Sequence, residues 1–261
     1  MRITPEQLKD IESFQNEKDM FYIISLISKG EDPQLISDLN NYVIARSDVG
    51  YPIWIWTKED LSKEKEKEIL SELNVFFEKG ENKFTSKKEI YDLLKKKYET
   101  LNELEMGFLS CEEAVKPLKG KGIFVKPNYA DKVTLAEYWR DNLKELYKKT
   151  ITQWEALEEI ENWLEEKKFY VLKDASGEIV CMAGYSIVDD LAKITHVYTP
   201  RDERRKGYCQ YLIYSLSKML LEEGYKPILY TDYQYEASNR AYQKVGFKDQ
   251  GTLMNYSIHK N

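Results

Sequence analysis

The chain has 261 residues, of which 42% are hydrophobic and 32% charged, and its formal net charge is -6. This share of apolar residues is enough for a hydrophobic core, and the length suits one large domain or two small ones. The acidic balance argues against a general polyanion binder, because such proteins hold phosphate backbones with an excess of lysine and arginine.

The cysteines and the termini indicate the compartment. Cys111, Cys181 and Cys209 show no paired spacing, and with only two histidines the chain does not predict a zinc site. Free thiols are expected, as in a reducing cytosol. No apolar run approaches the roughly 20 residues of a membrane helix, and the first residues lack the apolar stretch of a signal peptide. We therefore predict a cytoplasmic protein without a metal, a membrane or a nucleic acid as partner.

Residues 1–115 mix helical segments with strand-like runs. The run Tyr51–Thr57 alternates large aromatic and β-branched residues, which predicts a half-buried strand. In Lys87–Tyr98, apolar residues at helical spacing stand among lysine and glutamate, which predicts a helix with a solvated face. Further expected elements are strands over Tyr42–Ala45 and Glu105–Ser110 and a helix over Lys63–Phe77.

The segment Val115–Gly122 is rich in glycine, proline and lysine and reads as a connection, so a second domain is predicted over residues 121–261. Its elements, in chain order, are a strand over Ile123–Val125, a helix capped by Asp131 that runs to about Lys149, a helix over Thr152–Glu166, strands over Tyr170–Leu172, Ile179–Val188 and Ile194–Thr199, a helix from Gly207 to Gly224, a strand over Pro227–Thr231, a helix over Ala237–Val245 and a strand over Thr252–Ile258. This order predicts a mixed sheet flanked by helices.

The sharpest motif is the junction Arg204-Arg205-Lys206-Gly207-Tyr208-Cys209, where a charged loop leads from a strand into an amphipathic helix. The first amides of a helix have no internal acceptor and lie at the positive end of its dipole, so they bind phosphate oxygens readily. Arg201 adds charge at the same place. Neither a Walker A loop nor the three-glycine dinucleotide fingerprint is present. The residues alone are equally compatible with a basic loop that only caps a strand and a helix.

Arg204, Gly207 and Cys209, between a strand and a helix, resemble the coenzyme A signature Arg-x-x-Gly-x-Gly/Ala of the GNAT acetyltransferase superfamily. Cys209 departs from the usual last residue, but cysteine is compact. About thirty residues on, Asn239, Tyr242 and Gly246-Phe247 resemble the second motif, Asn-x-x-Tyr followed by Gly-Phe. The resemblance covers residues 123 to 259, and the whole chain looks like bacterial GNAT proteins that carry an N-terminal region before the GNAT domain.

The resemblance implies an α/β fold (mixed α+β) with a central, mostly antiparallel mixed sheet flanked by helices. Residues 1–115 are then consistent with a degenerate GNAT-like half that walls the acceptor site. Trp54 or Trp56 would line that site, although tryptophans that fill the core are the simpler interpretation.

The resemblance also implies which residues hold acetyl-coenzyme A. The amides of Val197 and Thr199, on either side of Tyr198, would bind the pantetheine arm. Asn239 would contact the cofactor or brace its helix. The amides expected to hold the pyrophosphate are those of Arg204, Arg205, Lys206, Gly207, Tyr208 and Cys209.

Tyr242 would donate a proton to the departing thiolate, since a phenol of pKa about 10 stays protonated at neutral pH and a thiolate has a pKa of about 8–9. The same residue could instead be a core aromatic of its helix. The attacking amine must be neutral, which calls for a base or a water relay. His196 is the histidine nearest the site in sequence, and its ordinary pKa suits the work. Glu137 and Asp232 are weaker candidates.

The expected function is that of an acetyl-coenzyme A-dependent N-acetyltransferase, which moves an acetyl group to a primary amine of a small molecule or peptide by direct attack in a ternary complex. One alternative is a non-catalytic coenzyme A-binding regulatory module. Another is a covalent enzyme with Cys209 as nucleophile, which lacks an evident base partner. The acceptor and the oligomeric state stay open, with a homodimer among the options.

Overall fold

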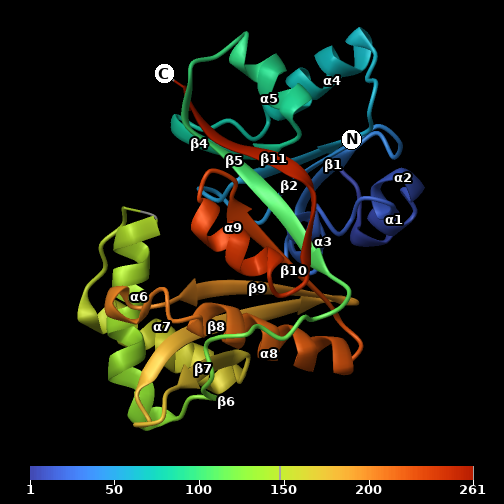
Figure 1. Cartoon of the computed structure of the whole chain (residues 1–261). Coiled ribbons are helices and arrows are strands. Elements are labelled where there is room, and N and C mark those ends of the chain that lie inside the picture. The colour runs from blue at the N-terminus through green and yellow to red at the C-terminus, as the bar shows by residue number, and fades with distance from the viewer. Residues whose placement is uncertain (147, 261) are drawn as a thin grey trace. The chain divides into compact units, whose positions relative to one another are not determined.

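The computed structural model describes residues 1–146 and 148–260 (Figure 1). The chain divides into two compact units, and the division does not follow chain order. The second unit comprises Leu109–Leu229 and Glu236–Asp249, whereas the first contains Met1–Phe108 together with Tyr230–Tyr235 and the segment from Gln250. The predicted boundary at residues 115 to 121 lies within the second unit, and two C-terminal segments belong to the first unit.

The first unit confirms the strands and helices expected before residue 115 and adds two short strands. In this unit the strand order is β1-β2-β3-β4-β11-β5. Its elements are α1 (Pro5–Lys9), α2 (Glu12–Gln15), α3 (Tyr22–Ile27), β1 (Gln34–Ser37), β2 (Tyr42–Arg46), β3 (Ile53–Thr57), α4 (Lys63–Leu73), β4 (Gly80–Ser86), α5 (Lys88–Lys95) and β5 (Thr100–Cys111).

The strand β4 has the sequence Gly-Glu-Asn-Lys-Phe-Thr-Ser, which carries little apolar alternation and so was not predicted. It forms because it is paired on both sides, parallel to β3 and antiparallel to β11, with Phe84 opposite Ile53 and Tyr256. Pairing with strands far away in sequence, rather than its own pattern, makes it a strand.

Both tryptophans of β3 fill the core of the first unit. Trp54 packs against Tyr230 with ring centroids 5.8 Å apart, and Trp56 meets Phe14 edge-on at 5.5 Å. Both side chains are buried. Packing alone therefore explains them, which is the simpler of the two interpretations of these residues.

The second unit confirms the predicted order of elements. Within it the strand order is β10-β9-β8-β7-β6, antiparallel except for the parallel pair β9 and β10. The elements from residue 123 onward are β6 (Ile123–Val125), α6 (Lys132–Leu146), α7 (Gln153–Glu166), β7 (Phe169–Lys173), β8 (Ile179–Val188), β9 (Leu191–Tyr198), α8 (Tyr208–Glu222), β10 (Lys226–Asp232), α9 (Glu236–Gln243) and β11 (Phe247–Lys260), with short 3-10 turns at Tyr129–Asp131 and Arg201–Glu203. Of these, the end of β10 from Tyr230 and β11 from Gln250 belong to the first unit.

The helix ends of the second unit follow local sequence signals, with one difference. α7 starts at a capping box of Thr152 and Glu155, and α8 begins after Gly207 at φ 88°, a conformation that favours glycine. Asp131, expected to cap the helix after it, instead accepts from the amide of Asn128, and Asn128 is the residue that caps the preceding 3-10 turn. The prediction for Asp131 was therefore wrong in position, because Asp131 is the last residue of a 3-10 turn that runs directly into α6 at Lys132.

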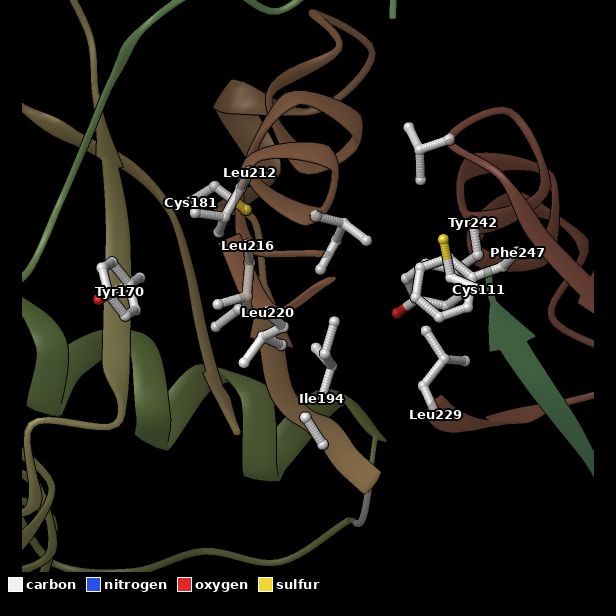
Figure 2. Packing of buried hydrophobic residues seen from close by; sticks show 14 of the residues in the cluster. Cys111, Tyr170, Cys181, Ile194, Leu212, Leu216, Leu220, Leu229, Tyr242 and Phe247 are labelled. Atoms are coloured by element: carbon white, nitrogen blue, oxygen red, sulfur yellow. The ribbon is translucent and has the colours of Figure 1, made fainter. Parts of the chain in front are cut away.

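Two layers of helices cover the sheet of the second unit. Leu212, Leu216 and Leu220 of α8 pack with Ile194 of β9 and with Tyr242 of α9 in one buried cluster (Figure 2). A second cluster joins α6 and α7 to the sheet; its buried members include Leu135, Trp139, Ile160, Phe169 and Tyr198. β9 thus contributes side chains to both layers. In the described part of the chain, no helix is long and apolar enough to cross a membrane.

Candidate functional site

The strand β9 contains an irregularity where the pantetheine amides were expected. Gly184 of β8 lies opposite Thr195, but Met182, two residues away, lies opposite Tyr198, so β9 has one residue more than β8. His196 lies between the two β9 residues of these pairs, and its φ of 54° is in the left-handed region. A bulge of this kind leaves a residue out of the ladder and bends the strand. The backbone near Val197 therefore departs from the regular ladder between β8 and β9.

On its other side β9 pairs with β10 only at its beginning. The paired positions run from Leu191 opposite Lys226 to Lys193 opposite Ile228, whereas β9 continues to Tyr198. An extended ligand with amide groups can hydrogen-bond to a strand edge of this kind by strand addition. The bulge and the end of the ladder thus lie within the same few residues.

A residue of α6 forms a hydrogen bond with the backbone at the bulge. The amide of Asn142, which is 1% exposed, donates from Nδ2 to the carbonyl of Val197 at 3.3 Å. A buried polar side chain is normally hydrogen-bonded, and here its partner is the backbone at the irregular step. Sequence reasoning missed Asn142, although a polar residue on the apolar stripe of Leu135, Trp139 and Leu143 was a usable signal.

Glu145, one turn further along α6, organises the start of the loop. Its two carboxylate oxygens pair with Arg201 at 2.5 Å and with Arg204 at 2.6 Å, and Arg204 also donates from Nε to the carbonyl of Thr199 at 2.9 Å. Partial burial acts to raise the pKa of Glu145, but the hydrogen bonds from Arg204 and Arg201 outweigh it and the net shift is downward. Arg204, the first residue of the motif, therefore anchors the loop to β9 and α6.

The helix α8 starts at Gly207, the glycine of the motif. Gly207 occupies the N-cap position at φ 88°, and no side chain caps it. The first amides of α8, from Tyr208 and Cys209 onward, have no intrahelical acceptor. Arg204 differs from the expectation in one respect, since its amide already donates to the carbonyl of Arg201 at 3.2 Å. The donors left for an anion therefore begin after Arg204.

Most of the cationic side chains of the loop form ion pairs. Arg201 and Arg204 are held by Glu145, and Lys206 pairs with Glu203 at 3.0 Å. Arg205 is exposed, with φ 64°. For a phosphate group, the loop therefore offers the amides of α8 and Arg205 rather than the other three cations that the sequence shows.

The helix α9 carries the second motif. Tyr242 is 8% exposed and meets Phe247 edge-on at 6.1 Å, and its hydroxyl is directed toward Ile194 of β9 in Figure 2. Asn239 lies one turn earlier and is partly buried. The ring of Tyr242 is thus a core residue, as one interpretation held, while its hydroxyl is directed toward the strand that carries the bulge. Its catalytic role stays a prediction.

His196 lies at the bulge but in an apolar setting. Its ring stacks on Trp163 at 4.5 Å and meets Trp139 edge-on at 4.9 Å. Burial, and next the positive charge of Lys193, lower the pKa of His196 to about 4. Burial also lowers the pKa of Lys193 to about 8. His196 is therefore neutral at pH 7, but with this pKa it is a weak base, which reduces the case for it as the catalytic base. Nothing in the sequence indicated the two tryptophans around it.

This setting predicts how acid affects stability. Because the folded-state pKa of His196 lies below the unfolded value near 6.5, its neutral form contributes stability that is complete above pH 6.5 and is lost as the pH falls toward 4. We expect His196→Gln to reduce the loss of unfolding free energy between pH 7 and pH 4.5 by about 2 kcal/mol. Urea unfolding of both proteins at the two pH values measures the difference, and equal losses would contradict the buried neutral imidazole.

Cys209 lies in the first turn of α8, and its side chain packs toward the core. Its side chain lies against the buried cluster of that helix. A hydrogen bond from the Cys181 thiol lowers the pKa of Cys209, while burial raises the pKa of Cys181, which also lies 3.1 Å from the Thr199 hydroxyl. The compact thiol therefore fills the place that the motif gives to glycine or alanine, and this packing explains Cys209 without a nucleophilic role.

The weaker base candidates lie at the surface. Glu137 of α6 and Asp232 at the end of β10 are both exposed.

Comparisons with known proteins agree with this geometry. The family model described as acetyltransferase (GNAT) family matches residues 135–247. No curated protein matches the sequence of this chain. Among solved structures, an acetyltransferase of the GNAT family from Colwellia psychrerythraea is 11% identical with a TM-score of 0.61, over 99% of this chain and 98% of that chain.

A GCN5-related N-acetyltransferase from Sphaerobacter thermophilus is 10% identical with a TM-score of 0.63, over 98% of this chain and 93% of that chain. A GCN5-related N-acetyltransferase from Kribbella flavida is 10% identical with a TM-score of 0.57, over 93% and 96%. At these identities the likeness establishes a shared fold, and it extends over the first unit as well as the second.

Proposed function

Because residues 135–247 belong to the acetyltransferase (GNAT) family, we propose that the protein is an acetyl-coenzyme A-dependent N-acetyltransferase that acts on a primary amine. The observation that carries the proposal is the uncapped start of α8 at Gly207, close in sequence to the bulge of β9. A helix start receives the pyrophosphate, and an irregular strand edge receives the amides of the pantetheine arm.

Residues of the second unit can be assigned to the pyrophosphate and to the pantetheine arm of acetyl-coenzyme A. The amides that follow Arg204, up to Cys209, hold the pyrophosphate, and Gly207 lets the backbone approach it. The amides of Val197 and Thr199 bind the pantetheine arm, and Asn142 and Arg204 fix the carbonyls of these two residues from the other side. Asn239 lies on α9 within the second motif and is assigned to the same ligand.

Acetyl-coenzyme A supplies an acetyl group whose bond to sulfur breaks as the bond to the acceptor nitrogen forms. Tyr242 donates its hydroxyl proton to the leaving sulfur and recovers a proton from the acceptor nitrogen through water. A phenol suits this step because its ordinary pKa, about 10, keeps it protonated at neutral pH and lies close to that of a thiol. His196, with a pKa of about 4, adds little as a base, so we assign removal of the amine proton to water.

The acceptor is a small molecule or peptide with a primary amine. The formal net charge of -6 favours a cationic acceptor, since a protein with an acidic surface raises the local concentration of cations. The amine must be neutral when it attacks, so activity should rise with pH through the range in which the amine and its surroundings lose protons.

Cofactor binding and release of free thiol test the proposal. At a concentration of acetyl-coenzyme A 100 times its Kd, we expect the ligand to stabilise the protein by about 2.7 kcal/mol, seen as a higher Tm. A panel of primary amines should then include acceptors that release free thiol only when the enzyme is present. A protein whose Tm does not respond to acetyl-coenzyme A would contradict the proposal.

A second candidate is a coenzyme A-binding regulatory module without catalysis. The observation in its favour is the low pKa of His196, which leaves no strong base at the bulge among the residues considered for that role. The same two measurements separate the candidates. Stabilisation by the cofactor without thiol release from any amine in the panel would favour the regulatory module.

A further inference from the structure

The connection between β5 and β6 crosses the second unit as a fixed segment, which we call the strap, Glu113–Gly122. At one end, the amide of Val115 donates to the carbonyl of Val245 at 3.0 Å, and a Cβ on Gly246 would lie 2.1 Å from the carbonyl oxygen of Glu113. At the other end, Gly122 lies against Leu172, whose Cγ would be 2.8 Å from a Cβ on this glycine. The strap is therefore attached on both sides of its centre.

The centre of the strap touches the residue at which α8 begins. Gly120 is buried and has φ 85°, and a Cβ on it would lie 1.9 Å from the carbonyl oxygen of Gly207 and 2.9 Å from the amide nitrogen of Tyr208. Conversely, a Cβ on Gly207 would lie 2.9 Å from Cβ of Lys119. The two glycines thus pack backbone against backbone, and this contact is possible only because neither carries a side chain.

This contact places a cation beside the loop. Lys119 is exposed, and its side chain starts next to Gly207. Within residues 1–146 and 148–260, Lys119 forms no ion pair, in contrast to Arg201 and Arg204, which Glu145 holds. The ammonium group of a lysine is carried on a flexible four-carbon chain, so it can adjust its position to pair with an anion at the start of the helix. The strap therefore adds a lysine without an ion pair in the described part of the chain, beside a loop in which Arg201, Arg204 and Lys206 each pair with a glutamate.

We propose that Lys119 of the strap is a cofactor-binding residue, which pairs with a phosphate of coenzyme A held at the start of α8. The inference rests on the proposed function, because it concerns the same ligand. The chemistry that Lys119 recognises is a phosphate group of a 3′-phosphorylated adenosine diphosphate, the part of the cofactor that carries its negative charge. The strap then both connects β5 to β6 and forms one wall of the phosphate site.

Calorimetric titration of the full-length chain with coenzyme A tests the proposal. We expect Lys119→Ala to raise the Kd about tenfold and Lys119→Glu to raise it more, because a charge-assisted hydrogen bond is lost and then replaced by repulsion. The matched control is Lys116→Ala, an exposed lysine of the same strap at the end attached to Val245, which should bind within twofold of wild type. The Tm of the ligand-free variants should be unchanged, because both side chains are exposed.

The 3′-dephospho form of coenzyme A identifies the phosphate group involved. A loss of affinity in Lys119→Ala that disappears with this ligand assigns the contact to the 3′-phosphate, and a loss that persists assigns it to the pyrophosphate. If wild type binds coenzyme A while both Lys119 variants bind as tightly as Lys116→Ala, the inference is wrong and the proposed function stands. If wild type does not bind, both fall.

Discussion

Gly207→Glu is expected to weaken acetyl-coenzyme A binding by at least a hundredfold, which corresponds to about 2.7 kcal/mol. The substitution places a carboxylate among the amides that would receive the pyrophosphate, so attraction is replaced by repulsion. It also introduces a Cβ at φ 88°, where it would lie 2.9 Å from the carbonyl carbon of Lys119. Calorimetric titration measures the affinity, and circular dichroism shows whether the variant is folded.

Gly177 is the matched control for this prediction. It has nearly the same backbone conformation, φ 89°, but a Cβ on it would meet nothing within 4 Å. Gly177→Glu therefore carries the same charge change and the same cost of a left-handed side chain, about 1 kcal/mol, away from the loop. We expect it to bind acetyl-coenzyme A within twofold of wild type. A folded Gly207→Glu variant that binds as well as this control would refute the phosphate site.

Tyr242→Phe is expected to lower kcat about a hundredfold while changing the Kd for acetyl-coenzyme A less than threefold. Loss of a general acid typically costs 10² to 10⁴ in rate, and the smaller value applies because a thiolate is a good leaving group. The ring of Tyr242 is buried and packs against Phe247, and phenylalanine keeps this packing. Thiol release at saturating donor measures kcat with an acceptor from the amine panel.

Tyr170 provides the control for Tyr242. It belongs to the same buried cluster (Figure 2) and is also 8% exposed. Its ring stacks on Phe124, with the ring centroids 4.5 Å apart. Tyr170→Phe removes a hydroxyl from the same core without touching the second motif, so kcat should stay at the wild-type value. Equal rates in the two variants would leave Tyr242 as a packing residue only.

Much of the second unit was predictable because its signals are local. Apolar residues at helical spacing marked α6, α7 and α8, and Gly224, at φ 87°, ends α8 as expected. The open amides at Gly207 depend only on a strand, a loop and a helix that follow one another, so a short motif was enough to indicate them.

The side chains that surround the predicted site residues could not be predicted from local sequence signals. His196 looked like a base because an isolated histidine has a suitable pKa, but Trp139 and Trp163, which arrive from two helices earlier in the chain, enclose its ring. Burial then lowers the pKa of His196. A pKa depends on every group packed around the side chain. Trp163 and Trp139 lie 33 and 57 residues before His196 (196 − 163 and 196 − 139), so the sequence next to His196 does not indicate them.

The amino-acid sequence by itself determined the order of strands and helices in the second unit, the helix start at Gly207 and the two motifs, because each depends on residues adjacent in the chain. Only the tertiary structure decided that Asn142 and Glu145 support the bulge and the loop, that the strap brings Lys119 to Gly207, and that the end of the chain pairs within the first unit. These contacts join segments that are distant in sequence, and their energies come from burial and pairing that exist only once the chain has folded.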